Sequence, residues 1–210
     1  MSGAGFFVVV EGPEGAGKTT LTRSLADRLV AVGLDPVVVR EPGGTEVAEA
    51  IRRELLDPAR RFDPARELLY LAAARADLVH HVIRPALASG RFVLSDRFTL
   101  STRAYQGAGR GLDPAWIDWM NRVATDGIEP DLTLVLDVPA AVGLARQRAG
   151  GKRPDRLERE DAAFHERVAA AYRAAEGPGV VHLDATRPPD QVLEEAWRAL
   201  PIAAARPARP

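Results

Sequence analysis

The 210-residue sequence contains no cysteine, which excludes a disulfide framework and any metal site built on thiolates. It also has no large excess of either charge. The formal net charge is −1, which argues against a nucleic-acid-binding surface or a polybasic membrane anchor. The apolar run at residues 6–10 is much too short to span a membrane, and no positively charged region precedes it. We therefore expect a cytoplasmic protein that binds neither nucleic acid nor membrane.

No internal repeat or linker divides the chain, so its length fits one domain that buries a continuous core. We predict a single domain over residues 1–200. The last ten residues, 201–210, are rich in proline, and we expect them to form a disordered tail.

Apolar runs of strand length alternate with stretches of helical periodicity, which predicts an α/β protein with a parallel sheet between helices. The content of β-branched residues and leucine in these runs suits strands that are buried on both faces. The predicted strands are residues 6–11, 36–40, 91–96, 131–138 and 179–184. We expect one helix from Lys18 to about Gly33 and a long one from about Pro64 to Ala88, with a kink near Pro85. A third helix begins at Pro114, with Asp113 as its N-cap.

The stretch "EGPEGAGKTT" at residues 11–20 has the frame G-x-x-x-x-G-K-T and lies between a predicted strand and a predicted helix. In such a phosphate-binding loop, glycines let backbone N–H groups converge on phosphate oxygens, and the helix N-terminus favours negative charge. Lys18 is one of only two lysines in the chain, which makes a chance match less plausible. The motif predicts that Lys18 reaches the β- and γ-phosphates and that the Thr19 hydroxyl binds Mg²⁺. The predicted ATP-binding residues of the loop are Gly12, Glu14, Gly15, Ala16, Gly17, Lys18, Thr19 and Thr20.

Other features narrow the class of phosphate-loop protein. No guanine-reading N-K-x-D follows a later strand, which excludes a GTPase switch of the usual kind. Asp96, which we predict to bind the metal with Thr19, is followed by Arg97 and not by a second acidic residue. Arg40 ends another strand, and open α/β sheets bind ligands at this carboxyl edge. Guanidinium groups bind phosphate bidentately, so both arginines indicate a phosphoryl acceptor.

Five motifs occur in order between Phe6 and Arg187: "EGPEGAGKTT", "REPGGT", "SDRFTLSTRAYQGAGRGLD", "PDLTLVLDVP" and "DATRP". They resemble the successive motifs of the bacterial thymidylate kinase family, and the third is specific to that family among P-loop kinases. The resemblance implies ATP-dependent phosphorylation of dTMP to dTDP for dTTP synthesis, by direct in-line transfer with Mg²⁺. It also implies a homodimer formed through long helices. We predict the P-loop NTPase fold, with a five-stranded parallel sheet in the order 2-3-1-4-5 and helices on both faces.

The resemblance assigns a dTMP site. It implies that Arg97 contacts the acceptor phosphate, that Arg75 bonds the thymine edge, and that Tyr105 packs where a ribose 2′-OH would lie. Glu14 would accept a hydrogen bond from the sugar 3′-OH, which accounts for a carboxylate inside a phosphate loop. The predicted dTMP-binding residues are Glu14, Arg40, Leu71, Arg75, Arg97, Ser101, Tyr105 and Gln106.

Two of these positions leave alternatives open. Arg75 lies on the apolar stripe of its helix, so it either bonds the base or forms an internal ion pair with Asp96 or Glu67. Leu71 stands where the family carries a phenylalanine that stacks on the pyrimidine. This departure predicts a weaker or less selective base contact.

Residues 146–160 are basic and lack apolar periodicity, so we expect a mobile lid that excludes water and supplies a cation. The phosphate loop contains no arginine, and the family then places the catalytic arginine in the lid. The candidates are Arg148, Lys152, Arg153 and Arg156. We favour Arg153, which joins Lys18, Arg97 and Asp96 as a predicted catalytic residue. Arg146 is expected to stack on adenine, with residues 184–188 on the other side of the ring.

Two rival functions remain. One is a kinase of another nucleoside monophosphate or deoxynucleoside, which the leucine at position 71 would favour. The other is a non-catalytic nucleotide-binding protein, which would bind nucleotide without forming ADP when an acceptor is added.

Overall fold

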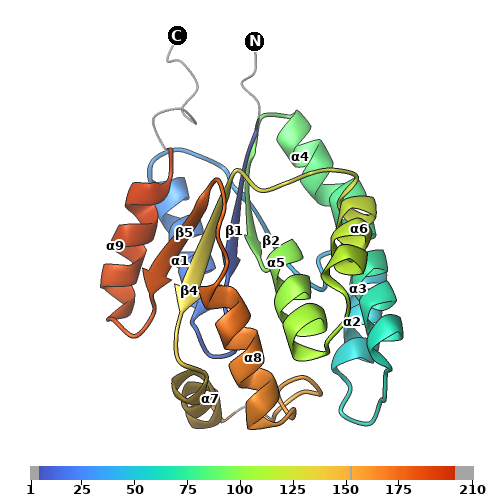
Figure 1. Ribbon diagram of the computed structural model, residues 1–210. Coiled ribbons are helices and arrows are strands. Elements are labelled where there is room, and N and C mark those ends of the chain that lie inside the picture. Colours follow the sequence, from blue (N-terminus) through green and yellow to red (C-terminus); the bar gives the residue numbers. More distant parts are fainter. Residues whose placement is uncertain (1–4, 152, 202–210) are drawn as a thin grey trace.

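The computed structural model describes residues 5–151 and 153–201 and is built on one five-stranded sheet (Figure 1). All neighbouring strands pair in parallel, in the order β2-β3-β1-β4-β5, which confirms the predicted order and fold class. The strands are β1 (Phe6–Glu11), β2 (Val37–Arg40), β3 (Phe92–Asp96), β4 (Leu132–Asp137) and β5 (Val180–Asp184). Each begins and ends within one residue of its predicted range. Residues 202–210 of the predicted tail lie outside the described part of the chain.

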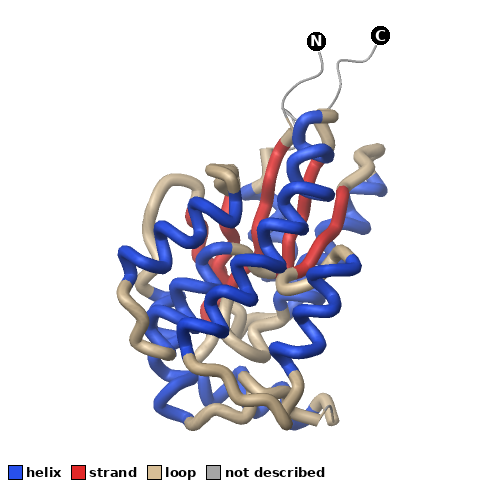
Figure 2. The backbone as a smooth tube through the Cα atoms, turned by 90° about the vertical axis from the view of Figure 1, so that its right-hand side faces the viewer, coloured by secondary structure: helices blue, strands red, loops and turns tan. Residues whose placement is uncertain are grey.

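Helices lie on both sides of the sheet, as Figure 2 shows for the red strands. Helices α1 and α9 pack on one face, against residues such as Val8 and Leu134. The segments α3, α4 and α8 cover the other face, against residues such as Phe7 and Val135. The helices are α1 (Lys18–Ala31), α2 (Glu46–Leu56), α3 (Pro64–Leu78), α4 (Arg84–Ala88), α5 (Thr99–Thr102), α6 (Pro114–Thr125), α7 (Ala140–Ala149), α8 (Ala162–Arg173) and α9 (Pro189–Ala199).

The expected long helix over residues 64–88 is interrupted by a π-helical turn, η1 (Val79–Ile83), between α3 and α4. Proline has no backbone N–H and its ring clashes with the carbonyl one turn earlier, so an irregular turn before Pro85 relieves both problems. The predicted kink therefore takes the form of a wider turn just before the proline. A second π-helical turn, η2 (Arg103–Gly109), follows α5.

Helix boundaries agree with the local signals. The Asp113 side chain accepts a hydrogen bond from the Ala115 N–H, and Pro114 is the first residue of α6, as predicted. Gly33 follows α1 with a φ of +85°, a conformation that favours glycine at a helix end.

The strand register places the predicted site residues side by side at the carboxyl edge of the sheet. Asp96 is the partner of Val10 on one side and of Arg40 on the other, so the ends of β1, β2 and β3 lie together. These carboxyl ends lie at the lower edge of the sheet in Figure 1, near α7. Loops at this edge of an open parallel sheet form the ligand site.

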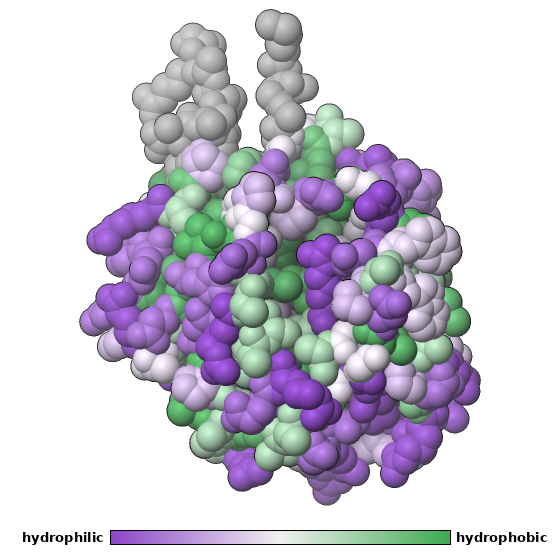
Figure 3. All heavy atoms as spheres, viewed as in Figure 1, coloured by the Kyte–Doolittle hydropathy of each residue, from purple (hydrophilic) through white to green (hydrophobic). Residues whose placement is uncertain are grey.

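Hydrophilic side chains cover most of the face seen in Figure 3, with smaller hydrophobic areas between them. Within the described residues, no helix is both long and apolar enough to cross a membrane.

Candidate active site

A cleft of about 490 Å³ opens at the carboxyl edge of the sheet. It is lined by the phosphate loop, the ends of β2 and β3, parts of α3 and η2, and the segment 155–158. All of the predicted site residues line this cleft except Gly12, Ala16 and Arg153. One cavity of a size typical of ligand sites therefore holds the residues assigned to both nucleotides.

The phosphate loop has backbone angles that only glycine adopts readily. Gly12, Gly15 and Gly17 have φ values of +145°, +68° and +95°. A Cβ on Gly15 would lie 2.0 Å from the carbonyl oxygen of Gly143, so the loop packs directly on the backbone of α7. This packing fixes the loop between β1 and α1.

Lys18, the first residue of α1, is buried inside the loop that precedes it. Its Nζ donates a hydrogen bond to the Pro13 carbonyl oxygen at 2.7 Å. Burial and the neighbouring Arg97 lower the pKa of Lys18 to about 8, against the opposing effect of Glu14. The ammonium is therefore held ready for an anion whose charge would compensate it.

Thr19 and Asp96 meet at the mouth of the loop. The Thr19 hydroxyl donates a hydrogen bond to Asp96 Oδ2 at 2.5 Å, and both residues line the cleft. Mg²⁺ prefers oxygen ligands and is usually held by one or two protein groups together with substrate phosphates. The described residues contain no cluster of three or more His, Cys, Asp or Glu side chains. The Thr19 hydroxyl and the Asp96 carboxylate are oxygen donors of the kind that Mg²⁺ prefers.

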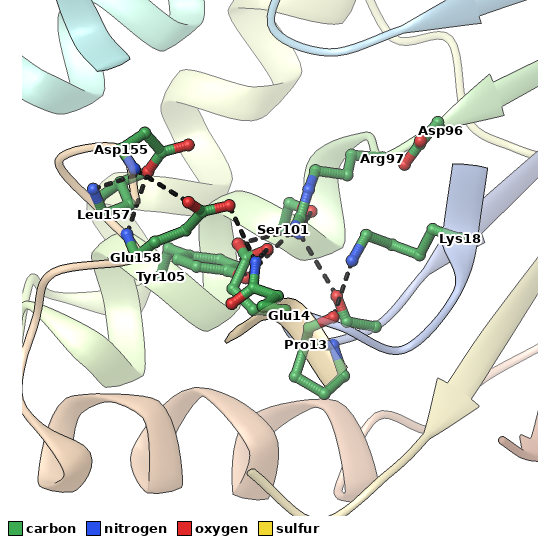
Figure 4. Close-up of polar contacts among 12 residues, drawn as sticks. Pro13, Glu14, Lys18, Asp96, Arg97, Ser101, Tyr105, Asp155, Leu157 and Glu158 are labelled. Atoms are coloured by element: carbon green, nitrogen blue, oxygen red, sulfur yellow. Dashed lines mark hydrogen bonds and ion pairs between the residues drawn. The ribbon is translucent and has the colours of Figure 1, made fainter. Parts of the chain in front are cut away.

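Glu14 lies among residues assigned to the acceptor, although it belongs to the phosphate loop (Figure 4). Its Oε1 accepts hydrogen bonds from Arg97 Nη2 at 2.8 Å and from the Tyr105 hydroxyl at 2.7 Å. Burial opposes ionisation, but the charges of Arg97 and Lys18 and the Tyr105 hydrogen bond together lower the pKa of Glu14 to about 2. Glu14 is thus a carboxylate at neutral pH, and it neutralises part of the positive charge of the cleft.

Arg97 is held by hydrogen bonds to the phosphate loop, α5, η2 and α8. Its Nη1 donates to Ser101 Oγ at 3.2 Å, to the Tyr172 hydroxyl at 3.1 Å and to the Gly12 carbonyl oxygen at 3.3 Å. Its backbone φ is +77°, which costs a non-glycine residue about 1–3 kcal/mol and is concentrated at functional sites. The surrounding contacts hold this strained residue in place.

Beneath Arg97 lies a buried carboxylate that sequence reasoning did not identify. Glu11 accepts hydrogen bonds from the Phe98 N–H, from the backbone and hydroxyl of Ser101, and from the Tyr172 hydroxyl. Burial raises the pKa of Glu11. A glutamate at the end of an otherwise apolar strand was a usable signal, whereas nothing near Tyr172 in the sequence indicated its place here.

Arg75 forms an internal ion pair, but its partner is Glu41 and not Asp96 or Glu67, the two carboxylates named from the sequence. Arg75 is 3% exposed, and its Nη2 lies 2.7 Å from Glu41 Oε2. It donates four hydrogen bonds, to Glu41 Oε2, Thr102 Oγ1, Asn121 Oδ1 and the Phe98 carbonyl oxygen. A guanidinium has five N–H donors, so at most one is left for a ligand. The predicted partners were wrong because Glu41 follows β2, far from Arg75 along the chain.

The other acceptor residues are placed as follows. Leu71 is half-buried, one turn before Arg75 on α3, and lines the cleft. Gln106 is buried in η2 and donates from Nε2 to Glu67 Oε1 at 2.7 Å. Arg40 is exposed and pairs with Glu49 at 2.9 Å.

The lid candidates separate into distinct positions. Arg146 lines the cleft and donates to the Ala185 carbonyl oxygen at 2.8 Å, so it lies beside the 184–188 loop. Arg148 and Arg153 are exposed and do not line the cleft, and Lys152 lies outside the described residues. Arg156 is 7% exposed and bound to Glu67, so it is not available as a cation in the cleft.

Comparison with known proteins gives a consistent result. The family model for thymidylate kinase matches residues 10–196. The chain is 49% identical to the thymidylate kinase of Thermomicrobium roseum over 195 residues, which cover 91% of this chain and 92% of the relative. It is 50% identical to that of Cereibacter sphaeroides (strain ATCC 17029 / ATH 2.4.9) over 208 residues, covering 95% and 96%. It is 46% identical to that of Deinococcus radiodurans over 199 residues, covering 93% and 96%.

Proposed function

The chain belongs to the thymidylate kinase family, and on that basis we propose that it transfers the γ-phosphoryl group of ATP to dTMP, giving ADP and dTDP. The observation that carries this proposal is the contact between Arg97 and the phosphate loop. Its guanidinium bonds Glu14 and the Gly12 carbonyl oxygen, two residues of the loop that also holds Lys18. A monophosphate bound by Arg97 would therefore lie next to the terminal phosphate of a bound nucleoside triphosphate.

On the donor side, the loop N–H groups and the N-terminus of α1 bind the phosphates, and Lys18 neutralises the β- and γ-phosphate charge. Arg146 and the 184–188 loop hold the adenine, which is consistent with their direct hydrogen bond. Thr19 and Asp96 would hold Mg²⁺, which would neutralise part of the charge of the transferring phosphoryl group.

On the acceptor side, Arg97 and Arg40 bind the phosphate of dTMP. Glu14 accepts a hydrogen bond from the sugar 3′-OH, and Tyr105 packs against the sugar. Ser101, Gln106 and Arg75 face the thymine edge, with Leu71 against its ring. Ser101 and Arg75 already bond several protein groups, whereas Gln106 bonds Glu67 through its NH₂ group and keeps its carbonyl oxygen for the base.

Direct transfer needs no covalent intermediate and no general base. The acceptor is a phosphate monoester whose second pKa is about 6, so its attacking oxygen is already ionised at neutral pH. The protein contributes position and charge, and a lid over residues 146–160 excludes water that would otherwise hydrolyse ATP. Arg153 is our proposed lid cation. A single domain over 1–200 and a cytoplasmic location stay predictions.

We also propose a homodimer. Helix α3 packs between α2 and α6, and this group carries most of the large exposed apolar side chains of the described chain. Leu69 is 51% exposed, Trp119 58% and Val123 57%. Burying such side chains against a second copy would remove them from water.

An acceptor panel tests the proposed function. ADP release is measured with ATP and each of dTMP, dUMP, dCMP, UMP and thymidine, and we expect dTMP to give the highest kcat/KM. A higher kcat/KM with another acceptor would show that dTMP is not the preferred substrate, while the proposed phosphoryl transfer from ATP would stand. Nucleotide binding without acceptor-dependent ADP release would overturn the enzyme assignment.

A further inference from the structure

The buried Glu67 carboxylate binds two other segments of the chain. It lies on α3 and is 1% exposed. Its Oε1 accepts hydrogen bonds from Gln106 Nε2 at 2.7 Å and from Arg110 Nε at 3.2 Å. Its Oε2 lies 2.6 Å from Arg156 Nη2 and 3.2 Å from Arg110 Nη2. The carboxylate thus joins η2, the residue that follows it and the segment after α7.

The charge of Glu67 determines which end of the Gln106 amide faces the cleft. An ionised carboxylate can only accept hydrogen bonds, so Gln106 must turn its NH₂ group toward Glu67. This orientation leaves the Gln106 Oε1, an acceptor, for a ligand in the cleft that Gln106 lines. An acceptor at that place suits a base with a ring N–H donor, as in thymine, and not one with an unprotonated ring nitrogen, as in cytosine.

Arg156 is an anchor for the segment around it. Its neighbours Asp155 and Leu157 line the cleft, whereas Arg156 does not line it and contacts α2 and α3 instead. Its Nε donates to the Leu55 carbonyl oxygen at 2.7 Å, and its backbone N–H donates to the Leu56 carbonyl oxygen at 3.2 Å. These bonds tie the segment to the C-terminal end of α2.

A second ion pair strengthens the same attachment. Arg110 Nη2 lies 2.7 Å from Glu160, which belongs to the anchored segment, and also contacts Glu67. Two arginines therefore face two carboxylates in a largely buried cluster, which compensates the cost of burying each charge. Removal of Glu67 would leave both arginines with less compensation.

We propose that Glu67 is a positioning residue that couples the attachment of segment 155–160, part of the predicted lid, to the orientation of the Gln106 amide. One carboxylate fixes both, so loosening the segment changes how the base is read. This inference rests on the proposed function, because it treats dTMP as the ligand of Gln106.

The test is a double-mutant cycle on substrate selectivity, the ratio of kcat/KM for dTMP to that for dCMP. The variants are Arg156→Ala, Gln106→Met and the double variant, each made with Glu67 and with Glu67→Gln. With Glu67 present, we expect the selectivity of the double variant to differ by about fivefold or more from the value obtained by multiplying the two single effects. With Glu67→Gln, we expect selectivity to be lower and the non-additivity to disappear. Effects of Arg156→Ala and Gln106→Met that multiply independently would overturn the coupling.

Arg159→Ala is the matched control, since Arg159 is an exposed arginine of the same segment whose Nε bonds the Pro154 carbonyl oxygen. We expect it to keep wild-type selectivity. Arg156→Lys retains the charge and should give an intermediate ratio, and circular dichroism identifies any variant that does not fold.

Hydrogen exchange of the full chain without nucleotide tests the attachment separately from catalysis. We expect faster amide exchange over 153–161 in Arg156→Ala and Glu67→Gln, but not in Arg159→Ala. Unchanged exchange in the first two would overturn the anchor. If the wild-type protein did not phosphorylate dTMP, the proposed function would fail, while this experiment would still decide the role of Glu67 in holding the segment.

Discussion

The Glu14 carboxylate lies 2.8 Å from Arg97 Nη2, so a residue of the phosphate loop is paired with the arginine that follows β3. This pair joins the loop assigned to ATP with the group assigned to the acceptor phosphate. Both side chains are largely buried, where a charge-assisted hydrogen bond is stronger than in water. The geometry explains how a phosphate loop tolerates a carboxylate: the charge of Glu14 is directed to Arg97.

Replacing Glu14 by glutamine should impair use of the acceptor. Glu14→Gln removes the charge partner of Arg97 and weakens the acceptor for a sugar hydroxyl. We expect kcat/KM for dTMP to fall by about tenfold or more, since hydrogen bonds to charged groups contribute about 1.5–3 kcal/mol. Steady-state kinetics measure this, with the exposed Glu166→Gln on α8 as control. Unchanged dTMP affinity and turnover would remove Glu14 from the acceptor site.

Activity should decline in alkaline solution because of Lys18. Its pKa in the free protein is about 8, so the ammonium loses its proton as the pH rises through this value. We expect kcat/KM for ATP, which reports the free enzyme, to fall above about pH 8. A profile that stays flat to pH 10 would contradict this.

Lys18 should also make the free energy of unfolding rise with pH, over the range in which the activity falls. The pKa of Lys18 is lower in the folded state than its ordinary value of 10.5, so the folded state binds fewer protons between about pH 8 and 10.5. The charged form therefore destabilises the fold below pH 8, and this cost disappears as the pH rises through that window. We expect the Tm advantage of Lys18→Met over wild type to shrink across it.

A phenylalanine at position 71 should tighten base binding. Leu71 lines the cleft beside Arg75, and aromatic stacking adds about 0.5–1.5 kcal/mol beyond area burial. We expect Leu71→Phe to lower the Kd for dTMP by about two- to tenfold, measured by calorimetry. Val30→Phe, at an exposed position of α1, is the control. A Leu71→Phe variant that binds dTMP no more tightly would show that the base does not rest on this residue.

Truncation of the proposed lid cation should slow the chemical step. We expect Arg153→Ala to lower kcat by more than tenfold if its guanidinium stabilises the transferring phosphoryl group. Rapid-quench measurement of a single turnover separates this step from product release. A smaller loss would exclude Arg153 from that role, and Arg148→Ala would then be tested as the alternative. Arg173→Ala, at the exposed end of α8, is the control for charge.

The buried pair of Arg75 and Glu41 should be important for stability. Arg75→Met leaves the Glu41 carboxylate buried without its partner, and breaking a buried pair in this way costs about 3–5 kcal/mol. We expect urea unfolding to show a loss of this size. Arg75→Met combined with Glu41→Leu should recover part of it, because no uncompensated charge remains. A double variant less stable than Arg75→Met alone would contradict this account.

Local patterns in the sequence were sufficient for the fold and for much of the site. Strand ranges follow from apolar runs, helix starts from caps such as Asp113, and the phosphate loop from glycine and lysine spacing. Each of these depends on neighbours within a few residues, and parallel strands must bring their carboxyl ends to one edge. Arg40, Asp96 and the loop could therefore be placed together in advance.

The tertiary structure alone decided which distant groups meet. Glu41 follows β2 and Arg75 lies on α3, so no local pattern links them. Tyr172 reaches Glu11 from α8, and Arg156 turns away from the cleft because Glu67 and the end of α2 offer it acceptors. Buried charges and hydroxyls must find partners, but packing of the whole chain determines which partner is within reach. The sequence by itself determined the type of site, and the fold selected the contacts that hold each residue within it.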